Sequence, residues 1–93
     1  MEFAIEIKAK PGTLQELDQT LQALLPTIRN EKGCRECRIY RDMEDGETFF
    51  ISINWKTRVS LGHYLRSSNG MALIGAIEML SGKAGVKIGE RAR

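Results

Sequence analysis

Three residues in the second half of the chain have side chains suited to chemistry on a small aromatic molecule. Trp55 is the only tryptophan and His63 the only histidine, and Tyr64 follows directly. An indole can stack on a flat ring, and an imidazole is a common general base near neutral pH. We therefore take this stretch as the candidate site, with His63 as the catalytic base and with Trp55 and Tyr64 as substrate-binding residues.

Apolar residues at alternate positions before Trp55 predict the strand that carries it. Phe49, Ile51 and Ile53 share this spacing with Trp55, so a strand would place all four side chains on one face. They would form the apolar floor of a pocket. We include Phe49, Ile51 and Ile53 among the substrate-binding candidates, whereas simple core packing at the strand end is the alternative for Trp55.

The helix expected over residues 58–67 leaves the direction of His63 open. At about 100° per residue, His63 lies about 200° from Leu61, whereas Tyr64 lies on the Leu61 side. His63 groups with Val59 instead. It faces a pocket only if this short helix is buried on two sides, and otherwise it faces solvent or a partner subunit.

Length and composition favour one soluble domain over residues 1–93. The formal net charge is only +2, and no block of like charges indicates a nucleic-acid-binding arm. The longest apolar run, Met71 to Ile77, is far shorter than the ~20 residues of a membrane span. Charged residues interrupt the N-terminus, which does not resemble a signal peptide. We expect a cytoplasmic protein with neither nucleic acid nor a membrane as partner.

Cys34 and Cys37 form a single C-x-x-C, and its context argues against a metal or redox site. A finger-type zinc site needs a second ligand pair, which one histidine cannot supply. The stretch from Cys34 to Asp42 also looks like a strand, in which residues three apart point to opposite faces. That geometry suits neither one metal nor one disulfide. We expect two reduced, partly buried thiols and no metal ligand.

The first helix should follow a strand over residues 2–10. Pro11-Gly12 ends that strand, and Thr13 with Glu16 three positions on resembles a capping box. Apolar residues at steps of three and four then give the helix one apolar stripe. Pro26 lies inside the stripe and lacks a backbone donor, so we expect a kink or an early end near Leu25.

Two helices and a strand should complete the chain. Thr57 could cap the first of these helices, and Asn69 could cap the second, over residues 70–80. The second helix is apolar on nearly every side, which is typical of a buried helix or one that covers a cavity. A short strand over residues 85–89 follows, and residues 91–93 should fray.

The resulting order, β-α-β-β-α-β, predicts an α+β fold of the ferredoxin-like plan, with a four-stranded antiparallel sheet and helices on one face. The Asp45-Gly46 turn joins the second and third strands of the chain. These two strands carry Tyr40 and Phe50 on the uncovered face. Packing two such faces together would bury both aromatics and leave charges at the rim. We therefore expect a homodimer through the face that bears Tyr40 and Phe50; a solvated face with scattered aromatics is the alternative.

Four features in this order are similar to a known family. Pro11-Gly12 ends the first strand, Gly33-Cys34 opens the second, Trp55 ends the third, and His63 lies in the next helix. Over nearly its whole length the chain resembles the antibiotic biosynthesis monooxygenase domain. The resemblance implies a dimeric α+β barrel with a cavity between helices and sheet. Some members oxidise quinols, anthrones or other polyphenols with O₂ and with no metal or flavin, so it implies no cofactor.

Other members of that family behave differently. Some degrade haem, one isomerises a phosphorylated signalling compound, and many have no known activity. The haem-degrading branch relies on an asparagine on the first strand and a histidine on the last helix. Those positions hold Ile5 and Leu73 here, so haem degradation is a poor match.

The residues and the resemblance together lead to one hypothesis and two rivals. The hypothesis is a cofactor-independent monooxygenase that oxidises a small aromatic substrate (a quinol, an anthrone or another polyphenol) with O₂ in a pocket between sheet and helices. The stronger rival is a non-catalytic, regulatory dimer that binds a small ligand in the same pocket. RNA-recognition domains use the same strand order, but the basic-glycine-aromatic motif is missing from this sequence.

Overall fold

The computed structural model describes the backbone of residues 1–89 and the side chains of residues 1–82, and it has the predicted α+β plan. The expected fraying of residues 91–93 lies outside the described residues. The elements in chain order are β1 (Glu2–Ala9), α1 (Leu14–Arg29), β2 (Cys34–Arg41), β3 (Thr48–Trp55), α2 (Arg58–Arg66), α3 (Ser68–Leu80) and β4 (Ser81–Gly89).

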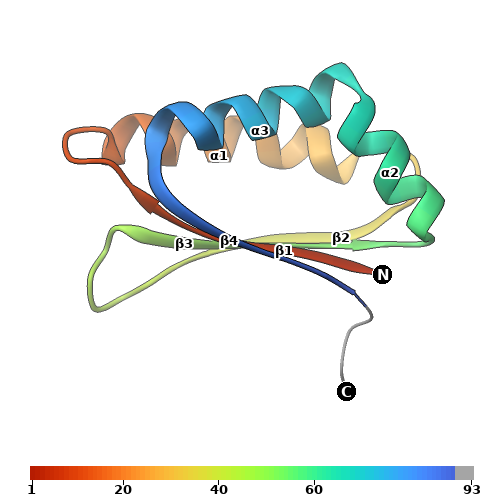
Figure 1. The fold of residues 1–93 in the computed structure, drawn as a ribbon, viewed down its shortest axis with the longest axis horizontal. Coiled ribbons are helices and arrows are strands. Elements are labelled where there is room, and N and C mark those ends of the chain that lie inside the picture. Colours follow the sequence, from red (N-terminus) through yellow and green to blue (C-terminus); the bar gives the residue numbers. More distant parts are fainter. Residues whose placement is uncertain (90–93) are drawn as a thin grey trace.

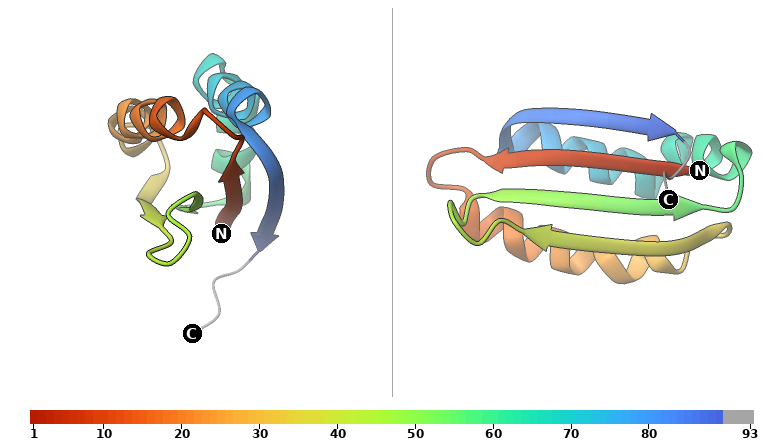
Figure 2. Two further views of the ribbon diagram at one scale, coloured as in Figure 1. Left: turned by 90° about the vertical axis from the view of Figure 1, so that its left-hand side faces the viewer. Right: turned by 90° about the horizontal axis from the view of Figure 1, so that it is seen from below.

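The four strands form one antiparallel, ferredoxin-like sheet in the order β2-β3-β1-β4. All three helices lie against one face of this sheet (Figure 1), and the other face is bare (Figure 2). Within residues 1–89, no helix has the length and apolar character needed to span a membrane.

The alternating apolar residues of the two central strands form the core on the helix side. They pair directly across the sheet and are all buried: Phe3 with Ile53, Ile5 with Ile51, and Ile7 with Phe49. The stripe of α1 closes over them through Leu17, Leu21 and Ile28. Burying each such side chain contributes about 1.5–3 kcal/mol, so the alternation determines which face of the sheet the helices cover.

A kink or an early end of α1 was predicted near Leu25, and the early end was wrong, since the helix continues through Pro26 to Arg29. Pro26 lacks its own N–H donor, but its carbonyl still accepts from Asn30 N–H at 3.1 Å. The last turn also buries Ile28 completely. Packing of that side chain offsets the loss of one helical hydrogen bond.

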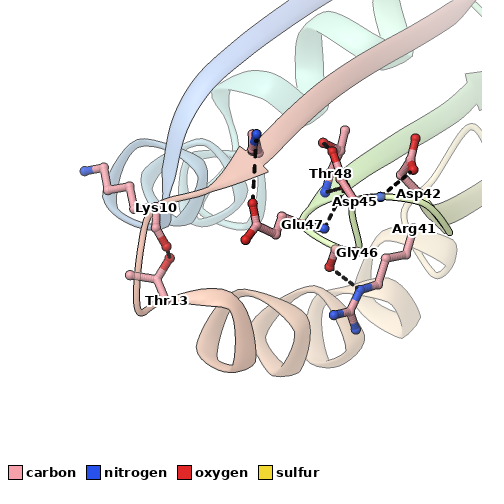
Figure 3. A network of polar contacts seen from close by, with 9 residues as sticks. Lys10, Thr13, Arg41, Asp42, Asp45, Gly46, Glu47 and Thr48 are labelled. Carbon is pink, nitrogen blue, oxygen red and sulfur yellow. Dashed lines mark hydrogen bonds and ion pairs between the residues drawn. The ribbon is translucent and has the colours of Figure 1, made fainter.

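The predicted capping box at the start of α1 was also wrong. The Thr13 side chain makes no capping hydrogen bond. Its hydroxyl instead donates towards the carbonyls of Lys10 at 2.9 Å and Leu80 at 2.8 Å, the first of which is visible in Figure 3. In a capping box the Glu16 side chain would accept a hydrogen bond from the Thr13 N–H. Here that N–H donates to the Lys10 carbonyl at 3.0 Å instead. Thr13 therefore ties the first loop to the end of α3.

The junction between α2 and α3 is organised by Ser67. Thr57 caps α2 as predicted. Ser67 ends that helix and caps α3, where its hydroxyl oxygen accepts from Gly70 N–H at 3.1 Å. The predicted cap, Asn69, lies inside α3 and donates to the Glu31 carboxylate at 2.8 Å. The sequence contains three candidate cap residues in a row here, and their contacts decide among them.

α3 is buried on one side only, so the first of its two predicted roles, a helix buried all round, was wrong. Leu73, Ile77 and Leu80 are buried against the core, whereas Met71 and Met79 are exposed. β4 then begins at residue 81, earlier than the expected strand over residues 85–89.

The bare face of the sheet carries the two aromatics as predicted. Tyr40 on β2 and Phe50 on β3 are direct neighbours across the hairpin, and they are 53% and 38% exposed. Ser52, on the same face, donates to the Glu2 carboxylate at 2.7 Å. This arrangement agrees with the predicted dimer surface, and the dimer itself stays a prediction.

Candidate functional site

β3 and α2 bring Trp55 and Tyr64 into contact at one end of the core. Trp55 is the last residue of β3, and Tyr64 lies on the buried side of α2. Their ring centroids are 5.0 Å apart and their planes are tilted by 32°, within the range of favourable aromatic pairs. Both side chains are 1% exposed. Two of the predicted site residues thus meet, although they come from different elements.

The two rings carry polar atoms that are buried without a hydrogen-bond partner. Within residues 1–82, Trp55 Nε1 and Tyr64 Oη are the only buried side-chain nitrogen or oxygen atoms in this condition. Leaving such a group unpaired costs about 1–3 kcal/mol, so native structures contain few of them. Each of these two neighbouring groups could donate a hydrogen bond to an acceptor oxygen.

Burial keeps the Tyr64 phenol protonated. Desolvation raises its pKa to about 12, and the charges of Glu31, Cys37 and Cys34 act in the same direction. At neutral pH Tyr64 is therefore a neutral phenol whose hydroxyl can donate, and the Trp55 N–H can only donate. The pair presents two donors and no charged group.

Two glycines allow the backbone segments at this end to approach closely. A Cβ on Gly70 would collide with the backbone carbonyl of Tyr64, and a Cβ on Gly33 would overlap the side chain of Ser60. Gly33 also has φ +88°, a left-handed conformation that favours glycine. Its carbonyl accepts from Lys56 N–H at 2.7 Å. The starts of β2 and α3 are thereby held against α2.

His63 lies on a different face of α2 from Tyr64. Its side chain and that of Val59 are exposed, whereas Leu61 and Tyr64 are buried. The orientation of α2 expected from its periodicity is confirmed. No hydrogen bond or ion pair joins His63 to another of the described residues. Within one chain, the structure does not gather His63 with the two aromatic residues.

The apolar candidates on β3 are core residues. Ile51 and Ile53 are buried beneath the helices. Phe49 lies at the opposite end of β3 from Trp55, where it lines a hollow of about 150 Å³ with Leu21 and other residues of α1 and β2. Phe49 and Trp55 therefore do not line one pocket with an open floor between them.

A second hollow, of about 410 Å³, opens beside β2 at the Trp55 end. It is lined by Arg29, Cys34, Arg35, Glu36, Cys37 and Arg38; we call it the cysteine hollow. Its volume is that of a small-molecule site. It adjoins the aromatic pair through Cys34, which is paired with Trp55 across the sheet. Arg29, whose guanidinium reaches it from the last turn of α1, had no recognisable signal in the sequence.

A β-bulge places Cys34 and Cys37 on the same face of β2. Cys34 pairs with Trp55 and Cys37 with Ile53, so three steps on β2 match two steps on β3. Arg35 is the extra residue. Because Trp55 and Ile53 both point into the core, the two cysteines do as well. The prediction that they face opposite sides was wrong, since it assumed a regular pleat.

The fold is shared with known proteins. The family model described as antibiotic biosynthesis monooxygenase matches residues 3–69. The crystal structure of PA3566 from Pseudomonas aeruginosa is similar with a TM-score of 0.87 and 22% identity, over 99% of this chain and 93% of that one. Rv0793 from Mycobacterium tuberculosis is similar with a TM-score of 0.82 and 18% identity, over 98% and 95%.

A third solved structure, described as an antibiotic biosynthesis monooxygenase, is similar with a TM-score of 0.86 and 16% identity, over 99% of this chain and 98% of that one. At these identities the structures share the fold with this chain and nothing finer. No curated protein matches this chain. The family model, however, covers the segment from the first strand through Trp55, His63 and Tyr64. The chain therefore belongs to the antibiotic biosynthesis monooxygenase family.

Proposed function

We propose that this protein is a cofactor-independent monooxygenase that oxidises a small aromatic molecule, such as a quinol, an anthrone or another polyphenol, with O₂. The observation that carries the proposal is the contact of two buried rings, each with an unpaired donor. Membership of the family supports the class of reaction. Phenol and carbonyl oxygens of such substrates are acceptors that match these donors.

In this reaction the substrate first loses a proton and becomes an electron-rich anion. The anion passes an electron to O₂, and a carbon–oxygen bond then forms. For an anthrone, the CH₂ group and O₂ yield the ketone and water, so atoms and electrons balance without a cofactor. Trp55 Nε1–H and Tyr64 Oη–H would stabilise the negative oxygen of the anion in a site that excludes water.

His63 is the general base in the proposal, and its position sets a condition. From the exposed side of α2 it reaches the substrate only if the substrate extends around the helix or a partner subunit closes over it. If neither occurs, water accepts the proton. The two cases differ in the effect of His63→Ala, which slows the reaction only in the first.

A homodimer completes the proposal. A second copy packed on the bare face would bury Tyr40 and Phe50, which lie side by side there. Replacing both by glutamate would put like charges into that interface, and sedimentation should then detect a monomer. Unchanged sedimentation would place the dimer contact elsewhere or show that none exists.

The test of the oxygenase is O₂ uptake with a panel of quinols and anthrones, together with metal and flavin analysis of the same sample. We expect uptake above autoxidation that falls about 100-fold in Tyr64→Phe, the usual effect of removing one oxyanion donor. Tyr40→Phe, which removes the same hydroxyl from an exposed ring, is the matched control. Uptake equal to autoxidation in every protein would contradict the oxygenase.

A non-catalytic dimer that binds a small ligand is the second candidate. The exposed position of His63 favours it, because a binding module needs no base. It predicts that an aromatic ligand changes the fluorescence of the single tryptophan, Trp55, with an affinity that Tyr64→Phe lowers and His63→Ala leaves intact. No O₂ would be consumed.

A further inference from the structure

The two cysteines of β2 have no part in the proposed oxygenation, yet the bulge at Arg35 brings them together. Both are free thiols; Cys37 is buried and Cys34 partly so. Both line the cysteine hollow of about 410 Å³. A pair of thiols that faces one hollow is a potential ligand set, which neither cysteine alone would be.

The spacing of the pair suits a bridging ion better than a disulfide. Their partners Trp55 and Ile53 are two residues apart on β3, a spacing of about 7 Å along a regular strand. That is the upper limit for a disulfide, whose sulfurs must come within about 2 Å. An ion bound between two thiolates, with bonds of about 2.3 Å, needs them only about 4.5 Å apart.

Two thiolates select a soft ion that accepts two ligands. Structural Zn²⁺ takes four ligands, and within residues 1–82 no group of three or more His, Cys, Asp or Glu side chains is arranged to hold a metal ion. Thiolate sulfur prefers Cu(I) to harder ions, and Cu(I) and Ag(I) form stable linear complexes with two sulfurs.

The groups around the two cysteines suit a metal complex that carries a negative charge. Two thiolates and one monovalent ion carry a net charge of −1. The Arg29 guanidinium donates to the Cys37 carbonyl at 3.0 and 2.9 Å. Its side chain lines the cysteine hollow together with both thiols. Arg29 is therefore held where it would stabilise that negative charge.

Tyr64 supplies the second, independent observation. Its hydroxyl is buried without a partner among residues 1–82, and its ring packs on Trp55, the neighbour of Cys34 across the sheet. A thiol is a weak acceptor, but a thiolate accepts hydrogen bonds strongly. Deprotonation of the cysteines by a bound ion would provide the acceptor that Tyr64 Oη lacks.

We propose that Cys34 and Cys37 form a two-thiolate site for a soft monovalent cation of the Cu(I) class, with Arg29 as counter-charge and Tyr64 Oη as donor to a bound sulfur. Each ion displaces one proton from each thiol. Two sulfur–metal bonds form, two S–H bonds break, and no electron is transferred. The site shares Tyr64 Oη with the oxygenase proposal, whereas Cys34 and Cys37 take no part in that reaction.

The test is a titration of the reduced full-length chain with Ag(I) in chloride-free buffer. We expect one ion per chain, two protons released per ion, and quenching of Trp55, the only tryptophan and the neighbour of Cys34 across the sheet. Cys34→Ser and Cys37→Ser should each weaken binding roughly 100-fold or more against a competing thiol. Urea denaturation confirms that each variant is folded, and Cys37→Ala is the second variant at the buried position.

Thioether sulfur also binds soft ions, so the control removes it. The exposed methionines Met43, Met71 and Met79 are changed together to leucine, and binding should not change. Release of a single proton, binding that survives either serine variant, or binding lost with the methionines would each overturn the site.

Discussion

The two ends of the sheet differ in whether their polar groups have hydrogen-bond partners. At the hairpin end (residues 10–13, 41–48 and 80–81), short hydrogen bonds tie the loops together (Figure 3). The Asp45 carboxylate alone accepts from Glu47 N–H at 2.7 Å, Thr48 N–H at 3.0 Å and Thr48 Oγ1 at 2.7 Å. Arg41 Nε donates to the Gly46 carbonyl at 2.7 Å. These polar groups find their hydrogen-bond partners within the chain itself.

At the tryptophan end (Trp55, Tyr64, Cys34 and Cys37) two buried donors have no hydrogen-bond partner among residues 1–82. Trp55 is the neighbour of Cys34 across the sheet, and Cys34 and Cys37 line the cysteine hollow. A polar group that the fold satisfies contributes to stability, whereas one that the fold buries and leaves unpaired costs stability. The difference assigns a structural role to the hairpin end and supports the proposed ligand site at the tryptophan end.

The largest effect on stability should come from adding a side chain where two backbone segments touch at the tryptophan end. Gly70→Ala would drive a Cβ into the Tyr64 carbonyl, and we expect a loss of about 3 kcal/mol in the free energy of unfolding. Gly75→Ala in the same helix is the matched control, because a Cβ there meets nothing within 4 Å. It should stabilise the protein by about 0.5–1 kcal/mol. Urea denaturation measures both; equal effects would show that the close contact is unimportant.

Removing the Tyr64 hydroxyl should separate stability from function. Tyr64→Phe relieves a buried unpaired donor, so we expect an unfolding free energy higher by about 1 kcal/mol together with the loss of O₂ uptake proposed above. Thermal unfolding and uptake are measured on one preparation. A destabilised variant would mean that the hydroxyl has a partner in the folded chain, and the contrast between the two ends would fail.

High pH should weaken the tryptophan end. Burial raises the pKa of Cys37 from its ordinary 9.0 to about 11, with the charge of Cys34 adding to the effect. The pKa of Tyr64 is raised from 10.0 to about 12. Because the folded state favours the protonated forms, their contribution is complete below about pH 9 and is lost as pH rises towards 12. Urea midpoints should fall over this range, less steeply in Cys37→Ser and Tyr64→Phe.

The smallest effect should come from the hairpin end, and it should be confined to stability. The three bonds that Asp45 accepts hold its pKa below the usual 3.8, the Thr48 hydroxyl most of all. Asp45→Ala should lower the urea midpoint at neutral pH and leave O₂ uptake unchanged. The wild-type advantage should disappear as pH falls below about 4, where the carboxylate is protonated. Glu44→Ala removes an acidic side chain of the same turn without such bonds and serves as control.

Much of the fold could be predicted from the spacing of apolar residues in the sequence. Alternation placed Phe3, Ile5 and Ile51 on the covered face. The wheel of α2 placed Tyr64 on the buried Leu61 side and His63 on a different side, and it left open whether that side faces solvent. Such patterns are predictive because the backbone repeats every 2 or 3.6 residues, and burial selects one side of the repeat. The resemblance carried by Pro11-Gly12, Gly33-Cys34, Trp55 and His63 likewise identified the family.

Only the tertiary structure decided the features that depend on distant partners. Thr13 donates to Leu80, 67 positions away, and so does not cap its own helix. The bulge at Arg35 exists only relative to β3, and it alone turns Cys34 and Cys37 to one side. The unpaired state of Trp55 Nε1 and Tyr64 Oη is a property of everything packed around them. Local repeats are encoded within a few residues, whereas register and hydrogen-bond satisfaction are set by segments that meet only in the folded chain.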